Sequence, residues 1–305
     1  MPNDQAHDTR TTVAEDRVAA AVSLSVAGVV ASVSNLPAAN MVVDTFESAN
    51  FSVPNGPAPL LNTVGFEWYN LTSASIVRAD QFVVNNGSTV NIGPISGKEW
   101  ENNPITSGQH SMRLRYEAER EMTEISFRFS EYQTELYFRY WMRVPINYTK
   151  QSLNDKFFSI FPTRATYDRL GTLTIQTRPN GSGGASLVYQ DGGVLVGETG
   201  STPFISVPSD RGRWMQVVLH FKRASTSSAN DGVYRSWRRW EDETAFTLLH
   251  SKTNANLFNS DDANGFKQGY VFGWANDPYT VETEFLIDDF EVSSSPLVPV
   301  GTEGL

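Results

Sequence analysis

The chain has 305 residues and no cysteine, which excludes disulfide bonds, thiolate chemistry and the disulfide-rich class of small secreted proteins. It has 24 lysines and arginines against 34 acidic residues, a net charge of −10, so no surplus of cations is present to displace the counterions of a nucleic acid. We therefore expect no nucleic-acid partner. The four histidines are too far apart in the sequence to suggest a zinc site. Nucleotide-binding glycine patterns, nucleophile elbows and protease triad spacings are also lacking, which disfavours most enzyme classes.

Helical periodicity is nearly absent, and the polar stretch from Glu117 to Glu124 is expected to give at most a turn. Aromatic residues make up 12% of the chain, and glycine and proline number 22 and 15. From Asp44 onward, short alternating runs are separated by turn-forming clusters such as VNNGSTVN, NGSGGAS and SSANDG. Many short strands separated by turns are typical of two antiparallel sheets packed face to face, so the sequence predicts an all-β sandwich.

Residues 1–40 differ from the rest of the chain, because they are rich in Ala, Val and Ser and contain no Phe, Trp or Tyr. The stretch from Arg17 to Ala39 resembles a secretory signal, but acidic residues precede it where such a signal needs positive charge. Serines and an asparagine interrupt its apolar run, which disfavours a membrane span. We expect residues 1–40 to form an extended arm that packs against a partner subunit, because a free segment this apolar would be a liability in water. Cleavage as a signal stays the alternative.

The sharpest alternation lies in ELYFRYWMRV, from Glu135 to Val144. As a strand, it would turn one apolar set of side chains to the core, namely Leu136, Phe138, Tyr140, Met142 and Val144. The opposite set is too aromatic for a plain solvated face and too charged for a core, since it consists of Tyr137, Arg139, Trp141 and Arg143. RWMQVVLHFKR and SMRLRYE repeat the arrangement. Arginines and aromatic rings on neighbouring strands are therefore expected to line a groove on an outer sheet face.

The segment DGVYRSWRRWEDE, Asp231 to Glu243, has two interpretations. As a sugar platform, an aromatic ring would stack on the apolar face of a pyranose while arginine donates paired hydrogen bonds to hydroxyls or to a uronate carboxylate. As an edge strand, its tryptophans would pack under a loop and its arginines would pair with the acids that follow. Both interpretations stay open.

Lys156 and His220 carry further candidate chemistry. In NDKFFSIFP, Lys156 points away from Phe157 and either neutralises an acidic sugar or reaches solvent. His220 lies on the strand expected from RWMQVVLHFKR, on the face that carries Gln216 and Lys222. It either serves as a general base or is structural.

Two acids lie within the expected final strand, FLIDDFEVSSSP. An unpaired buried carboxylate is costly, and a calcium ion would satisfy Asp288 and Asp289. The segment DTFES would bring Asp44 and Glu47 from the first strand to the same place. The alternative is hydrogen bonding to backbone or to an arginine.

Seven pieces in fixed order resemble the concanavalin A-like jelly-roll domains related to polysaccharide lyases: DTFESANFS, HSMRLRYEAE, ELYFRYWMRVPINY, NDKFFSIFP, DRGRWMQVVLHFKRAS, DGVYRSWRRWEDE and FLIDDFEVS. Similar domains occur in virion proteins of tailed bacteriophages. The resemblance runs from about Asp44 to Ser295 and implies a two-sheet jelly roll with a carbohydrate-facing groove and, in some members, a structural calcium. The signature strands of the alginate-lyase branch are not matched. Carried onto this sequence, the resemblance implies a groove lined by Arg115, Tyr137, Arg139, Trp141, Lys156 and Trp237.

Taken together, the patterns predict an N-terminal arm at 1–40, a jelly-roll domain at 41–296 and a C-terminal tail at 297–305. The preferred function is a structural or decoration protein of a virion, displayed on its surface or outside the cell as a homo-oligomer, which binds polysaccharide and contacts other virion proteins. The alternative is a polysaccharide lyase acting on a uronate polymer, with Arg139 neutralising the carboxylate and Tyr137 or His220 removing the proton. A third hypothesis is an architectural protein whose groove is filled by a neighbouring subunit.

Overall fold

The computed structural model describes residues 42–46, 61–62, 64–72, 74–78, 83–85, 89–91, 110–162, 172–191, 194–197, 203–258 and 265–298. The arm predicted for residues 1–40 lies outside these ranges, as do residues 299–305 of the predicted tail. The described residues form strands, turns and bends and contain no helix, which agrees with the lack of helical periodicity. A search of the described segments for a helix suited to crossing a membrane found none.

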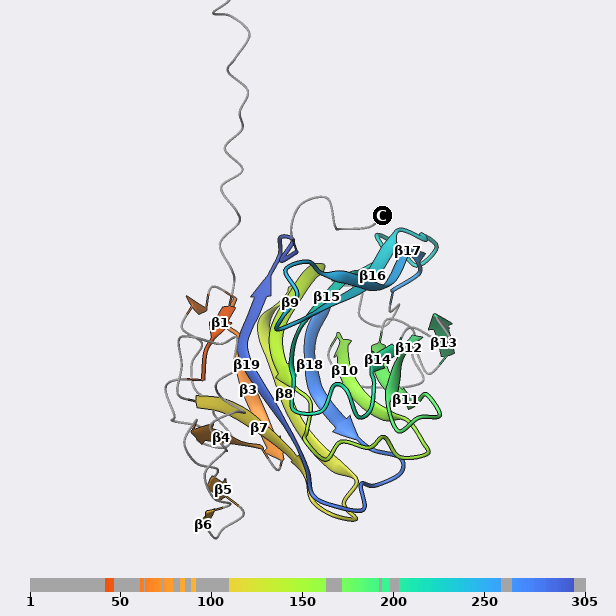
Figure 1. Ribbon diagram of the computed structural model, residues 1–305. Coiled ribbons are helices and arrows are strands. Elements are labelled where there is room, and N and C mark those ends of the chain that lie inside the picture. The colour runs from red at the N-terminus through yellow and green to blue at the C-terminus, as the bar shows by residue number, and fades with distance from the viewer. Residues whose placement is uncertain are drawn as a thin grey trace, which may run out of the picture. The chain divides into compact units, whose positions relative to one another are not determined.

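The strands form two large antiparallel sheets (Figure 1). Sheet A follows the path β17-β16-β15-β9-β19-β1-β2, with β7 also pairing with β19 and β4 pairing with β7. Its strands are β1 (Val42–Asp44), β2 (Leu61–Asn62), β4 (Ala74–Arg78), β7 (His110–Tyr116), β9 (Glu135–Arg143), β15 (Trp214–Lys222), β16 (Gly232–Trp240), β17 (Thr247–Ala255) and β19 (Thr283–Ser293).

Sheet B follows the path β13-β12-β11-β10-β18-β8-β3, with β14 pairing with β12. A separate two-stranded hairpin joins β5 (Val83–Asn85) to β6 (Thr89–Asn91). The strands of sheet B are β3 (Glu67–Thr72), β8 (Met122–Gln133), β10 (Asp155–Phe161), β11 (Leu173–Pro179), β12 (Ala185–Asp191), β13 (Val194–Gly197), β14 (Pro203–Ile205) and β18 (Phe266–Trp274).

The core lies between the two sheets and is built largely from aromatic rings. The ring centroid of Phe138 in sheet A lies 5.0 Å from that of Phe158 in sheet B. The ring of Phe221, also in sheet A, is stacked on Phe158 with centroids 5.6 Å apart. The apolar face predicted for β9 is confirmed, because all five of its residues are buried in this core. The two-layer arrangement confirms the all-β sandwich, and its antiparallel sheets are those of a jelly roll.

The structure also settles how β16 is placed. β16 pairs with β15 on one side and with β17 on the other, so the edge-strand interpretation of this segment is wrong. Tyr234 and Trp240 belong to the core between the sheets, whereas Trp237 lies in a second apolar cluster on the outer face of sheet A. The alternation therefore separates two tryptophans of one strand onto opposite faces.

Candidate functional site

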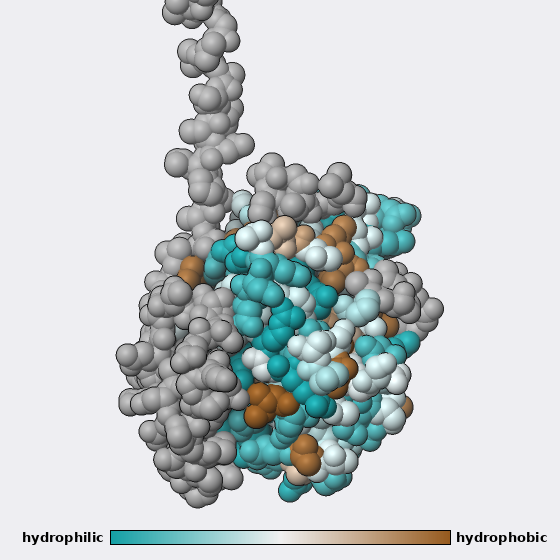
Figure 2. All heavy atoms as spheres, viewed as in Figure 1, coloured by the Kyte–Doolittle hydropathy of each residue, from teal (hydrophilic) through white to brown (hydrophobic). Residues whose placement is uncertain are grey.

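The outer face of sheet B is polar and is called here the polar face. Ile125, Phe127, Val271 and Ile175 point into the core, so the residues between them point outward. One row of polar side chains crosses five neighbouring strands, each member standing opposite the next: Gln190, Thr174, Ser159, Tyr270 and Ser126. Gln190 is half-buried, and the other four are buried. In the view of Figure 2, the described surface is mostly hydrophilic, with small and separate hydrophobic patches.

Strand β18 is kinked within this face. Phe272 has a φ of 58°, in the left-handed region that bulky residues rarely adopt, and Gly273 follows with a φ of 155°. The kink turns the Phe272 ring into the core, where its centroid lies 5.6 Å from that of Phe157 and 4.6 Å from that of Phe285. The packing of these three core rings therefore holds Phe272 in a backbone conformation that a residue of a regular strand does not adopt.

Three side chains meet at the buried Gly273, and this position is called the notch. A Cβ atom at Gly273 would lie 3.2 Å from Cβ of Lys156, 3.3 Å from Cε2 of Tyr270 and 3.6 Å from Oε2 of Glu124. The notch is therefore bordered by an ammonium-bearing side chain, a phenol ring and a carboxylate from three adjacent strands. A side chain at Gly273 would press against Lys156 and Tyr270, so only glycine lets the three groups approach this closely.

Burial raises the pKa of Glu124 above the usual range of a glutamate, against the opposing effects of a hydrogen bond from Ser126 and the charge of Lys156. The Ser126 hydroxyl donates to Oε1 of Glu124 at 2.7 Å. The raised pKa makes this carboxylate a stronger base than that of an ordinary glutamate. The notch thus combines a proton-transfer group with a cation.

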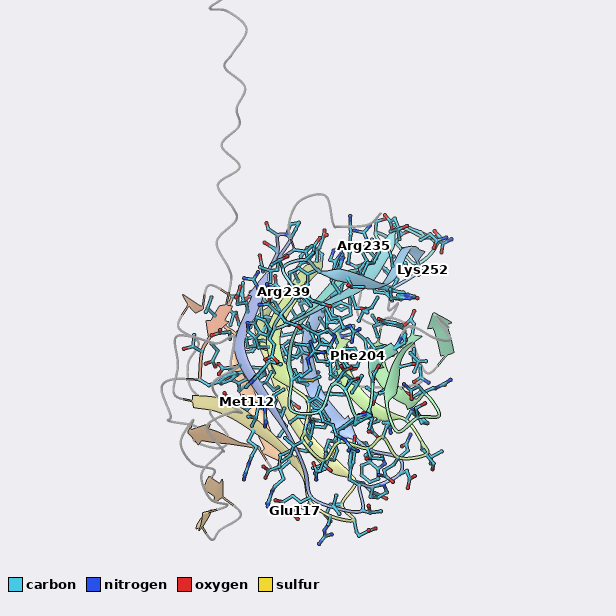
Figure 3. All side chains as sticks on the ribbon, in the orientation of Figure 1. Met112, Glu117, Phe204, Arg235, Arg239 and Lys252 are labelled. Carbon is cyan, nitrogen blue, oxygen red and sulfur yellow. The ribbon has the colours of Figure 1, made fainter. Side chains whose placement is uncertain are left out.

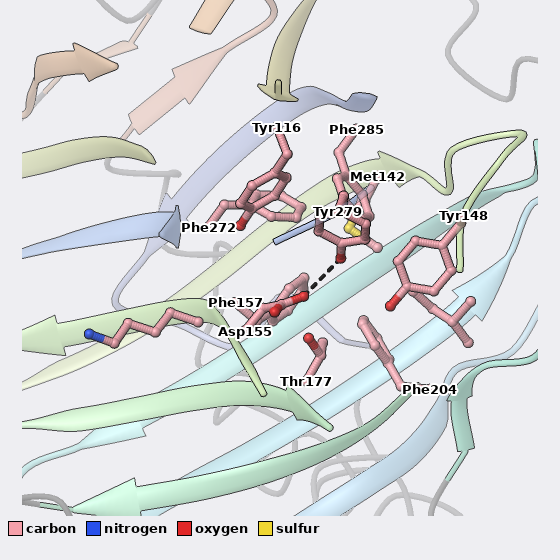
Figure 4. Close-up of a pocket in the computed structure, with 12 residues that line it drawn as sticks. Tyr116, Met142, Tyr148, Asp155, Phe157, Thr177, Phe204, Phe272, Tyr279 and Phe285 are labelled. Atoms are coloured by element: carbon pink, nitrogen blue, oxygen red, sulfur yellow. Dashed lines mark hydrogen bonds between the residues drawn. The ribbon is translucent and has the colours of Figure 1, made fainter. Parts of the chain in front are cut away.

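A buried polar cluster supports the notch from behind (Figure 4). The Tyr116 hydroxyl donates to the Gly273 carbonyl at 2.8 Å, which ties the kink to sheet A. The Tyr279 hydroxyl donates to Oδ2 of Asp155 at 2.8 Å, and Nζ of Lys150 lies 3.0 Å from Oδ1 of the same carboxylate. Burial raises the pKa of Asp155 and lowers that of Lys150, while the attraction between them opposes both shifts. Asp155 directly precedes Lys156, so this pair fixes the start of β10.

Four amide side chains extend the polar face from the loop after β18 to β12. Nδ2 of Asn276 donates to Oδ1 of Asn154 at 3.1 Å, and Nδ2 of Asn154 donates to Oε1 of Gln176. Nε2 of Gln176 donates to Oε1 of Gln190 at 2.5 Å. Because every amide donates in the same direction, the orientation of each one is fixed by its neighbour.

The residues predicted for the groove do not form one surface. Lys156 lies on sheet B, whereas the other five lie on sheet A. Arg115 is buried and pairs with Glu282 at 2.9 Å and Glu117 at 2.7 Å. Figure 3 shows Glu117 at the opposite end of the sandwich from Arg235, which is on the same strand as Trp237. Alternation identifies which side of a strand a residue faces, but not which sheet the strand joins, and this is why the predicted set is divided.

The expected open groove on sheet A is covered by the chain itself. Tyr137 and Trp237 are buried with Val218 beneath Leu297 and Val298. The residues assigned to the start of a tail thus form part of the domain's packing, and the two rings do not line an open surface. Contact of these rings with sugar is untested and stays a prediction.

Arg139 and Trp141 are also engaged within the chain. Arg139 donates to both oxygens of Glu291, at 2.8 Å and 2.7 Å, and to the Leu297 carbonyl at 3.1 Å. Trp141 is buried, and the guanidinium of Arg239 lies 5.1 Å from its ring centre. The cationic and aromatic groups of this face therefore satisfy one another.

The three residues named for a lyase, His220, Tyr137 and Arg139, lie on adjacent strands. The rings of His220 and Tyr137 are stacked with centroids 3.9 Å apart, and Nε2 of His220 lies 2.8 Å from Oε1 of Glu135. Burial lowers the pKa of His220 in spite of this partner, so the imidazole is neutral at pH 7. The group has the chemistry of a base but lies buried beside the Leu297–Val298 cover, and its role in catalysis stays untested.

Two of the four acids predicted to bind calcium, Asp44 and Asp288, accept hydrogen bonds from protein donors. Asp44 accepts from the Phe46 backbone N–H and from Nε1 of Trp68, both at 2.8 Å, and burial raises its pKa to about 6. Asp288 accepts from the Ser111 hydroxyl and from the Asp289 backbone N–H, both at 2.7 Å. Glu47 lies outside the described residues, and the described part contains no group of three or more acidic or histidine side chains suited to a metal.

Calcium binding stays a prediction. Bound calcium stabilises only the folded state, so the melting temperature should fall when a chelator such as EGTA is added. A melting temperature that does not change would contradict the site.

Sequence reasoning missed the residues of the polar face other than Lys156. Glu124 was expected to end a polar turn, but β8 already begins at Met122. The alternation of MTEISFRFSEYQ and of FKQGYVFGW could have identified Glu124 and Tyr270 as outward-facing. The kink at Phe272 has no sequence signal other than the glycine that follows it.

No protein-family model matches the sequence, and no curated protein matches it significantly. Among solved structures, the catalytic domain of a glycoside hydrolase family 131 protein from Coprinopsis cinerea has 12% identity and a TM-score of 0.45, over 85% of this chain and 96% of that one. Alginate lyase vAL-1 from Chlorella virus has 10% identity and a TM-score of 0.39, over 62% and 86%. The exoplasmic/lumenal domain of VIP36, in a Ca2+/Man3GlcNAc-bound form, has 13% identity and a TM-score of 0.37, over 63% of this chain and 82% of that one. Likenesses this distant identify neither a family nor a function for the chain.

Proposed function

We propose that this chain binds a polysaccharide on the polar face of sheet B, around the notch at Gly273. The observation that carries the proposal is the convergence of Lys156, Tyr270 and Glu124 on a glycine near the end of β18, on the outer face of sheet B. Carboxylate, phenol and ammonium groups together donate to and accept from sugar hydroxyls, and the ammonium group also pairs with acidic substituents. Lys156 and Glu124 are only half-buried, so solvent and ligands reach them.

The shape of the face favours a polymer over a single sugar. Glu124 on β8 and Gln190 on β12 are both half-buried and lie on the first and the last of five neighbouring strands. Neighbouring strands lie about 4.8 Å apart, so this part of the face is about 19 Å wide. An extended chain of several sugar units would be needed to contact both residues.

A polysaccharide lyase is the second candidate, because the notch holds proton-transfer groups beside a cation. In such an elimination, a base takes the proton next to the uronate carboxylate, the bond to the leaving oxygen breaks, a carbon–carbon double bond forms and the leaving oxygen receives a proton. Glu124 would take the proton and Lys156 would neutralise the carboxylate, since both are half-buried. The Tyr270 hydroxyl, which is buried, is the candidate for protonating the leaving oxygen. These assignments differ from those the sequence suggested on sheet A.

The proposal also covers the biological context of the chain. The resemblance to domains of bacteriophage virion proteins and the composition of residues 1–40 support a homo-oligomeric component displayed on a virion, outside the cell, with the arm contacting other virion proteins. The arm lies outside the described residues. The mass in solution of the chain with and without residues 1–40 is the measurement that bears on its role.

The test is a panel of acidic and neutral polysaccharides, including alginate and glucuronan, assayed by affinity electrophoresis. We expect Glu124→Gln and Lys156→Met each to weaken binding about tenfold or more, because a hydrogen bond to a charged group contributes about 1.5–3 kcal/mol. Ultraviolet absorbance of the unsaturated product, followed in the same samples, detects the lyase. Loss of that absorbance in Tyr270→Phe with binding retained would assign the proton transfer.

Lys222→Met is the matched control, since Lys222 is 46% exposed and lies on sheet A. It should bind every polysaccharide as the unaltered chain does. Binding by the unaltered chain to no polymer of the panel, or equal binding by all variants, would contradict the proposed site.

A further inference from the structure

The four amides described above have hydrogen-bonding capacity beyond their mutual contacts. An amide has two N–H donors and two acceptor lone pairs, and Asn154 and Gln176 each spend one donor and one lone pair within the chain of amides. Gln176 is buried, whereas Asn154 and Gln190 are half-buried and Asn276 is exposed. Groups that both donate and accept thus stand at both ends of the row. A sugar hydroxyl, which also both donates and accepts, matches them.

Trp274 connects the row of four amides to the notch. It directly follows Gly273 and precedes Asn276 by two residues, and its side chain is 42% exposed although Gly273 and Ala275 beside it are buried. The Asn276 backbone N–H donates to the Asn154 carbonyl at 3.2 Å, which joins the segment after β18 to the start of β10. An exposed indole is a flat apolar surface of the kind that packs against the apolar face of a pyranose.

The region of the four amides and Trp274 differs in charge from the notch. All four amides are neutral, and the indole is neutral as well, whereas Lys156 and Glu124 at the notch are ionisable. Gln176 stands directly opposite Lys156 in the strand register, so the two regions adjoin. A single sugar chain would therefore meet first a charged and then an uncharged set of groups.

From this arrangement we infer that Trp274 and the amides Asn276, Asn154, Gln176 and Gln190 form a second subsite, which binds an uncharged, hydroxyl-bearing sugar unit next to the unit held at the notch. The inference rests on the proposed function and refines it. The ligand it implies is an oligosaccharide long enough to reach from Gly273 past Trp274.

Chain-length dependence of affinity tests the subsite. Alginate and cellulose oligosaccharides from disaccharide to octasaccharide are titrated calorimetrically into the unaltered chain, Trp274→Ala and Asn276→Ala. The affinity of the unaltered chain should rise with length and then level off. Both variants should lose about three- to tenfold for the longer oligosaccharides, the range that an aromatic or hydrogen-bond contact supplies, and nothing for the shortest one that binds.

Ile146→Ala and Asn256→Ala are the controls, since Ile146 is 59% exposed and Asn256, which follows β17, is a half-buried amide that donates to the Ser227 carbonyl on sheet A's side of the chain. Neither should change affinity at any length. If Glu124→Gln weakens binding while Trp274→Ala and Asn276→Ala bind long oligosaccharides normally, the subsite is refuted and the proposed function stands. A uniform loss at all lengths in these two variants also refutes it. Binding of neither series by the unaltered chain would reject both.

Discussion

Lys150→Met should lower the free energy of unfolding by about 3–5 kcal/mol, the usual cost of leaving one member of a buried ion pair without its partner. The Lys150 side chain is 0% exposed and that of Asp155 is 5% exposed, with Nζ and Oδ1 3.0 Å apart. Removing the ammonium group would leave a carboxylate whose pKa burial already raises. Urea unfolding measures the change, as a shift of the midpoint at constant slope.

The double variant Lys150→Met, Asp155→Asn should recover most of the loss, because no charge then remains buried and the amide oxygen still accepts from the Tyr279 hydroxyl. Lys222→Met, which breaks a contact of 3.9 Å between exposed groups, should change stability by less than about 1 kcal/mol. A loss of that small size in Lys150→Met itself would show that the pair is not buried as described.

His250 should make the protein less stable in mild acid. Its ring packs against those of Tyr189 and Tyr234, at centroid distances of 4.1 Å and 5.1 Å, and neither of its nitrogens has a hydrogen-bond partner among the described residues. Burial, with a smaller effect of Lys252, lowers its pKa from 6.5 to about 4. The neutral imidazole is therefore favoured in the folded state, so the stabilisation is complete above pH 6.5 and is lost as the pH falls toward 4.

As the pH falls from about 7.5 to about 4.5, protonation of His250 should lower the free energy of unfolding by up to about 2.5 kcal/mol. Other groups act in the opposite sense: burial raises the pKa of Asp44 to about 6 and of Glu284 to about 7, so their ionisation costs stability as the pH rises. The effect of His250 is therefore measured as the difference in pH dependence between two proteins. Unfolding free energies at both pH values are compared for the unaltered chain and for His250→Phe, which retains a ring against the two tyrosines. The two proteins should differ in pH dependence by up to this amount, and equal pH dependence would contradict the assignment.

The sequence was sufficient for the architecture and for the inner faces of the strands. Leu136, Phe138 and Tyr140 were assigned to the core from a period of two, because burial of one face imposes that period on a strand. The outer faces could not be assigned in this way. Whether Tyr137 meets solvent depends on Leu297 and Val298, which lie about 160 residues away in the sequence and follow no strand pattern.

The candidate site shows the same limit. Lys156 was assigned to an outer face, but the sequence did not indicate that β10 pairs with β11 and β18 and so belongs to sheet B. Its neighbours at the notch, Glu124 and Tyr270, come from strands 30 residues before and over 100 residues after it. Bringing them together requires the strand order, which depends on long-range pairing and not on local pattern.

The cover that Leu297 and Val298 form on sheet A has a practical consequence for measurements on an immobilised protein. A support attached at Val298 itself would be tethered beside the outer face of sheet A, and the opposite layer of the sandwich would be directed toward the bulk solution. Sensor chips and beads coupled through this residue should accordingly leave the notch accessible to long sugar chains.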